Sequence, residues 1–142
     1  VSRDLHIGHS DTFYSAGVKL NYKNFVGAGE YAKRDLNAPL ASLTGWYGMI
    51  GYRWWKFLPN FTFAHIKTTN TAALNAMTDA ELPQAQQTYT YGIDYYISGN
   101  FVVKMAASDI TPLSGTRGLF NTSVPSGVKT TWLYGIGLDA VF

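Results

Sequence analysis

The feature that most constrains the fold of this chain is a two-residue alternation of apolar and polar side chains. It is clear between Thr12 and Tyr22, where every second residue is apolar. These residues begin and end with a tyrosine: Tyr14, Ala16, Val18, Leu20 and Tyr22. Side chains two residues apart share a face of a β-strand, whereas a helix repeats every 3 to 4 residues. Similar alternation recurs in residues 25–34, 45–56, 60–67, 88–97, 101–108 and 130–142. The sequence therefore predicts an all-β fold with seven strands.

The connections between these segments alternate strictly in length. Short ones fall at about 23–24, 55–59 and 98–100, and long ones, rich in Asn, Ser, Thr, Pro and Gly, fall at about 35–44, 68–87 and 111–129. In an antiparallel up-and-down meander, alternate connections lie at the same end of the sheet, as they do in outer-membrane barrels. We expect residues 11–142 to form such a meander within a single domain, with a short helix in residues 71–82 that ends at Pro83.

Composition excludes several classes of protein. The chain has no Cys, which rules out a disulfide scaffold and any thiolate metal or redox site. Its net charge of +2 is spread along the sequence and gives no electrostatic footprint for nucleic acid. Its longest stretch without a charge, residues 36–52, is interrupted by Asn37, Pro39 and Ser42, so it is no transmembrane helix. A closed β-barrel remains as the way in which such a chain spans lipid.

The residues on the apolar faces favour a membrane barrel over a soluble one. A soluble barrel fills its interior with Leu, Val and Ile, whereas these faces carry aromatic residues near the strand ends and small or aliphatic residues between them. This is the pattern of a lipid-facing band between two aromatic girdles. We expect the girdles to include Trp46, Trp54, Tyr89, Tyr95, Trp132 and Tyr134.

The opposite faces carry single charges, which belong on a wet lumen, since Lys or Arg facing lipid at the midplane costs roughly 2–4 kcal/mol. The expected pore-lining residues are Lys19, Glu30, Arg34, Arg53, Asp94, Lys104 and Asp139. Charges of this kind tune ion selectivity in channels. The alternative is that they simply pair with one another across neighbouring strands. Four basic residues against three acidic ones do not predict an anion-selective channel.

Three segments resemble a known family. Residues 134–142, with Tyr134, Ile136, Leu138 and Phe142 at alternate or near-alternate positions, resemble the terminal strand signal of Gram-negative outer-membrane barrels. Residues 51–59 and 91–104 resemble the C-terminal half of general porins, so that the likeness covers residues 11–142. The resemblance implies a transmembrane β-barrel of 16 or so strands, integral to the bacterial outer membrane and commonly trimeric. It also implies contact with outer-membrane lipid, assembly by the barrel-insertion machinery, and passive diffusion of small hydrophilic solutes and ions.

Residues 1–10 leave two architectures open, because bacterial single-chain barrels have an even number of strands. If these residues form a loop, the chain is part of a larger porin, and the start at Val1 without a signal-peptide pattern favours a processed protein or a fragment. If they form an eighth strand, the chain is a small barrel with a structural or adhesive role and no open pore. Asp4, His6 and His9 favour the loop.

No residue pattern predicts an enzyme, a metal site or a cofactor. On a strand, His6 and His9 point to opposite faces, and His65 has no Ser or Asp beside it in the sequence. Residues 27–32 and 135–140 match a loose dinucleotide fingerprint, but both lie inside predicted strands with no helix after them. Gly27, Gly29 and Gly48 share an outward face, where they either admit a neighbouring subunit or mark bending of the sheet.

Overall fold

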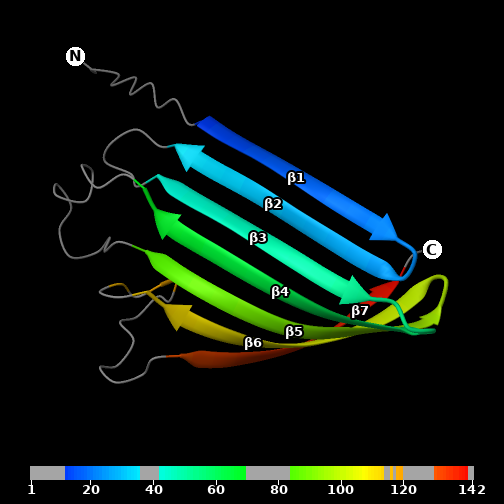
Figure 1. The fold of residues 1–142 in the computed structure, drawn as a ribbon. Coiled ribbons are helices and arrows are strands. Elements are labelled where there is room, and N and C mark those ends of the chain that lie inside the picture. Colours follow the sequence, from blue (N-terminus) through cyan, green and yellow to red (C-terminus); the bar gives the residue numbers. More distant parts are fainter. Residues whose placement is uncertain are drawn as a thin grey trace, which may run out of the picture.

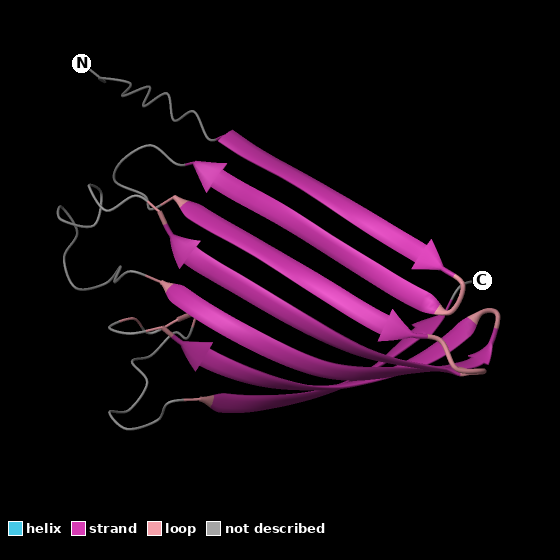
Figure 2. Ribbon diagram, in the orientation of Figure 1, coloured by secondary structure: helices cyan, strands magenta, loops and turns pink. Residues whose placement is uncertain are grey.

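The chain forms one seven-stranded antiparallel sheet whose strands lie in sequence order (Figures 1 and 2). The computed structural model describes residues 12–35, 42–69, 84–113, 116, 118–119 and 130–140, and these contain no helix. The strands are β1 (Thr12–Tyr22), β2 (Phe25–Asp35), β3 (Leu43–Tyr52), β4 (Phe57–Thr68), β5 (Ala85–Ser98), β6 (Phe101–Pro112) and β7 (Thr131–Ala140). The predicted all-β meander is confirmed for this part of the chain.

The three short connections, β1–β2, β3–β4 and β5–β6, lie at one end of the sheet (Figure 1). We call this the short-turn end and the opposite one the long-loop end. Lys23 and Trp55 hold left-handed backbone conformations in two of these turns, with φ of 53° and 54°. Such values are uncommon for residues other than glycine, and tight turns are where they occur. The helix expected at 71–82 and the alternatives for 1–10 lie outside the described residues.

The turn between β3 and β4 differs from the sequence prediction. Strand β3 ends at Tyr52, and β4 begins at Phe57, where the sequence placed a turn that reached Pro59. Trp54 and Phe57 close this turn through two backbone hydrogen bonds, of 2.8 and 2.9 Å. Pro59 is tolerated inside β4 because pairing with β3 ends at Asn60, so its missing N–H costs no bond to that neighbour. The prediction that Trp54 continues the β3 strand was therefore wrong.

Pairing between strands sorts the side chains onto two faces. Residues directly opposite each other in an antiparallel pair point to the same side of the sheet. Ile93 pairs with Met105, which pairs with Ile136, and all three lie on what we call the aromatic face. Asp94 pairs with Lys104 on the other, mixed face. The register joins the alternating positions of all seven strands into these two continuous surfaces.

The described part of the chain has no conventional hydrophobic core. Its buried apolar side chains are Val26 and Leu58, each 6% exposed, and both lie on the mixed face. On the aromatic face Tyr134 and Ile136 are 75% and 79% exposed. The sheet is curved, and the short-turn end of β7 passes behind the front strands (Figure 1). Side chains crowd together on the inside of a curved sheet, which identifies the mixed face as the concave one.

Side chain and backbone pack tightly on the mixed face at Gly92. A Cβ atom there would lie 3.0 Å from Cγ of Asn60 and closer still to its Oδ1. The Asn60 side chain is itself held by an Nδ2 hydrogen bond of 3.2 Å to the Leu58 carbonyl oxygen. We expect Gly92→Ala to destabilise the protein by about 1 kcal/mol, because Asn60 must give up this position. Denaturant titration measures the loss, with Gly135→Ala as the control, because a Cβ there meets nothing within 4 Å. Equal stability of the two variants would contradict the prediction.

Candidate functional site

The mixed face gathers the charged residues that the sequence singled out. Strand pairing places six of them on this one face: Lys19, Glu30, Arg34, Asp94, Lys104 and Asp139. Arg53 lies beyond the end of β3, where its backbone N–H donates to the Asn24 carbonyl oxygen at 2.7 Å. Its guanidinium carbon stands 5.9 Å from the centre of the Tyr96 ring, a side chain of the same face. Residues far apart in the sequence thus form one charged surface.

Three of these charges form a cluster near the short-turn end. The Lys104 Nζ lies 2.5 Å from Oδ2 of Asp139 on β7, and Lys104 directly faces Asp94 on β5. The ion pair is about half exposed, so it contributes only about 0–1 kcal/mol to stability. One lysine between two carboxylates leaves the cluster with a formal charge of −1. The pairing considered from sequence is therefore realised for Lys104 and Asp139.

Glu30 stands apart from this cluster. No ion pair or hydrogen bond of its carboxylate occurs among the described residues. It lines a hollow of about 380 Å³ on the mixed face, which extends from β2 across β3 and β4 to β5. Tyr47, Ala64 and Thr88 line the same hollow, together with Leu119 from the segment after β6. The concave side thus keeps open space beside an acidic side chain.

The segment after β6 folds back against β5, an arrangement that no pattern in the sequence predicts. Thr116 Oγ1 lies 2.8 Å from the Ala85 carbonyl oxygen, and the Leu119 N–H donates to Oε1 of Gln86 at 3.1 Å. Gly118 has a φ of +63°, and a Cβ there would lie 2.9 Å from the same Gln86 oxygen. The backbone conformation therefore favours glycine, and a side chain there would displace the end of Gln86. This anchoring places Leu119 beside the hollow that Glu30 lines.

The aromatic face carries the remaining residues expected to act as girdles. Trp46, Tyr89, Tyr95, Trp132 and Tyr134 all lie on it, together with Ile136 and Leu138. Ring contacts link neighbouring strands: Trp46 to Phe63 at 5.2 Å, Phe63 to Tyr89 at 5.0 Å and Phe57 to Tyr95 at 4.9 Å between ring centres. Trp54, in the turn, is 71% exposed. Phe142 lies outside the described residues.

Charged side chains on the aromatic face are confined to the long-loop end of the strands. Going along β2 and β4, Lys33 and Lys67 come after Tyr31 and Phe63, and on β6 Asp109 comes after Ala107. Asp109 accepts a hydrogen bond from the Thr130 hydroxyl. Between this end and the short turns, the positions on this face of the seven strands carry no charge. The aromatic face thus contains a continuous charge-free band.

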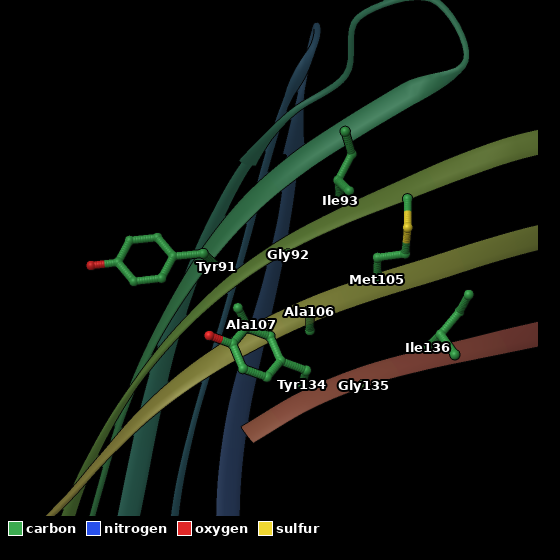
Figure 3. A pocket seen from close by; sticks show the side chains of 9 residues that line it. All are labelled: Tyr91, Gly92, Ile93, Met105, Ala106, Ala107, Tyr134, Gly135 and Ile136. Carbon is green, nitrogen blue, oxygen red and sulfur yellow. The ribbon is translucent and has the colours of Figure 1, made fainter. Parts of the chain in front are cut away.

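A shallow hollow of about 600 Å³ interrupts this band between β5 and β7 (Figure 3). Ala107 is directly opposite both Tyr91 and Tyr134, so the small side chain lies between two rings. Ile93, Met105 and Ile136 form the next row (Figure 3). The hollow is apolar apart from the two tyrosine hydroxyls.

A smaller opening in the band occurs at the glycines of β2 and β3. Gly29 pairs with Gly48, and a Cβ at Gly48 would meet nothing within 4 Å.

In the described ranges there is no group of three or more His, Cys, Asp or Glu placed to hold a metal ion. Nor do these ranges contain a helix long and apolar enough to cross a membrane.

Comparison of the chain with protein-family models, with curated proteins and with solved structures gave no match.

Proposed function

We propose that this chain is part of an integral outer-membrane β-barrel that forms a water-filled channel, similar to a general porin. The observation that carries the proposal is the contrast between the two faces of one sheet. The aromatic face is exposed and charge-free over its middle, and the concave face carries the charges. Monomeric soluble proteins rarely expose a continuous apolar surface larger than a few hundred Å². A lipid surface removes the exposed rings and aliphatic side chains from water.

The dimensions of the band support this function. On β7 the charge-free positions of the aromatic face run from Trp132 to Ala140, and on β5 the aromatic and aliphatic side chains of this face run from Tyr89 to Ile97. Each run spans nine residues, and a tilted transmembrane strand needs about 9–11. Aromatic rings lie toward the ends of the band, where interfacial Tyr and Trp sit in outer-membrane barrels.

The open edges of the sheet support closure into a barrel by further strands. Strands β1 and β7 each have only one neighbour among the described strands, so each leaves a row of backbone groups unpaired. In lipid every such group needs a hydrogen-bond partner, which only a closed barrel supplies. In the proposed protein, further strands of the same polypeptide close it to a barrel of 16 or so strands. The barrel associates as a trimer and is assembled by the barrel-insertion machinery.

The channel has no chemical step, so no catalytic residue is assigned. Small hydrophilic solutes and ions pass along the concave face, where Lys19, Glu30, Arg34, Asp94 and Lys104 meet water. Conductance of the full-length protein in planar lipid bilayers tests this function. Stable open steps are expected, and their absence in correctly folded protein would refute the channel.

Spin labels test the assignment of the two faces. We expect labels at Ile93 and Val103 to be accessible to oxygen dissolved in lipid, and labels at Asp94 and Lys104 to be accessible to water-soluble reagents. Register provides the reason, since Ile93 pairs with Met105 on the aromatic face and Asp94 pairs with Lys104 on the mixed face. Power-saturation measurements in vesicles distinguish the two classes. A swapped pattern would mean that the mixed face, and not the aromatic one, contacts lipid.

A further inference from the structure

Two lysines lie in one row across the sheet at the long-loop end of the aromatic face. Lys33 of β2 and Lys67 of β4 both pair with Thr44 of β3, so the three residues form one row across the sheet. Direct cross-strand neighbours lie about 4.5–5.5 Å apart at Cβ, so the two lysines start about 10 Å apart. They line a single hollow of about 460 Å³, together with Tyr14, Trp46 and His65. Strands distant in sequence thus bring two ammonium groups to one opening.

The charge balance of this hollow is positive. Lys33 Nζ forms an ion pair of 2.7 Å with Asp35 and lies 5.9 Å from the centre of the Tyr14 ring. An ammonium group has three donors, so this pairing leaves Lys33 able to donate further hydrogen bonds. No ion pair of Lys67 occurs in the part of the chain that the structure describes. His65, stacked against Trp46 with ring centres 6.2 Å apart, adds a ring nitrogen to the same wall.

The position of the hollow relates it to a bilayer. Immediately toward the middle of the sheet, the next row holds Tyr31, Trp46 and His65, and the row after it holds Gly29, Gly48 and Phe63. Cations therefore stand beside an aromatic girdle, at the depth where lipid headgroups lie. Beyond the girdle, the space left by Gly48 gives a hydrocarbon chain room to lie against the sheet. Phosphate next to the lysines and acyl chain next to the glycines fit one ligand.

We propose that the hollow lined by Lys33 and Lys67 is a binding site for the phosphate of an anionic lipid, whose acyl chain lies over Gly29 and Gly48. This inference rests on the proposed membrane function and names a lipid class for one place on its surface. Both lysines supply charge-assisted hydrogen bonds to phosphate oxygens, and Thr44 lies between them. The Asp35 carboxylate competes with phosphate for Lys33, so the affinity of the site for phosphate depends on Asp35.

Lipid binding to the full-length protein in detergent tests the site. Native mass spectrometry would count bound dioleoylphosphatidylglycerol and, separately, bound dioleoylphosphatidylcholine, whose headgroup has no net charge. We expect the wild type to prefer phosphatidylglycerol. A lysine near a membrane surface contributes about 1 kcal/mol to attraction of anionic lipid, so Lys33→Gln and Lys67→Gln should each weaken phosphatidylglycerol binding about fivefold.

Matched variants separate this site from general surface charge. Lys56→Gln removes a lysine at the short-turn end, where Nζ donates to the Ile97 carbonyl oxygen at 3.3 Å, and it should leave the preference unchanged. Asp35→Asn removes the competing carboxylate and should tighten phosphatidylglycerol binding. Heat-modifiable gel mobility verifies that each variant is folded before its binding is compared.

The outcomes are distinguishable from those of the proposed function. Equal binding of the two lipids by the wild type would overturn the site, as would an unchanged preference in the Lys33→Gln/Lys67→Gln variant. Inorganic phosphate that binds as tightly as phosphatidylglycerol would overturn the lipid as its source. If the protein conducts in bilayers but gives any of these three results, only this inference is refuted. Folded protein without conductance refutes the proposed channel, and the binding comparison still decides the lipid site.

Discussion

Ile136→Lys is expected to destabilise the protein in a phospholipid bilayer by about 2–4 kcal/mol, the cost of a lysine at the midplane of a lipid-facing barrel surface. Ile136 is at the centre of the charge-free run of β7 and is 79% exposed. In water, lysine at so exposed a position would change stability by less than about 0.5 kcal/mol. Equilibrium unfolding by guanidinium in lipid vesicles measures the difference.

Gly135→Lys is the matched control for this substitution. Gly135 is adjacent in the same strand and faces the opposite side, and a Cβ atom at this position would meet nothing within 4 Å. We expect its lysine to reach water on the concave face and to cost less than about 1 kcal/mol. Equal and small losses for both variants would contradict a lipid-facing aromatic surface.

Lys104→Met is expected to shift the ion preference of the proposed channel toward cations by about fivefold. The lysine lies between Asp94 and Asp139, and its removal leaves two carboxylates without this neighbour. A unit charge about 4 Å from a passing ion in water changes its energy by about 1 kcal/mol, which corresponds to that ratio. Reversal potentials under a potassium chloride gradient measure the shift.

Lys33→Met serves as the control for the selectivity measurement. It removes the same charge from the aromatic face, so permeating ions should not sense it. Indistinguishable reversal potentials for Lys104→Met and the wild type would exclude the concave face as the ion path. A shift of the same size in Lys33→Met would contradict the separation of the two faces.

Much of the architecture was predictable because strand formation depends on a local, two-residue period. The run from Tyr14 to Tyr22 and the run from Tyr89 to Ile97 show their apolar face without reference to any other segment. Because paired residues share a face, antiparallel pairing carries this local order across the whole sheet. The same reasoning placed Asp94 and Lys104 together on the opposite side before their partners were known.

The turn from β3 to β4 was less predictable because a strand tolerates proline only where the neighbouring strand needs no hydrogen bond from its backbone nitrogen. Pro59 reads as a turn residue in the sequence, but it lies just past the last pair between β3 and β4. Trp54 is an even number of residues from Trp46 and so fits the alternation of β3. It nevertheless lies outside the strand, because its two backbone hydrogen bonds with Phe57 form the turn there.

The sequence by itself determined the number and order of the strands, their two faces and the end at which the short turns lie, because each of these follows from spacing along the chain. Only the tertiary structure decided which charges meet. The ion pair of Lys104 with Asp139, the row that joins Lys33 to Lys67 and the position of Leu119 beside Glu30 all depend on register between strands or on the path of a loop. Register is a property of pairs of strands, and local periodicity leaves the loop path undetermined.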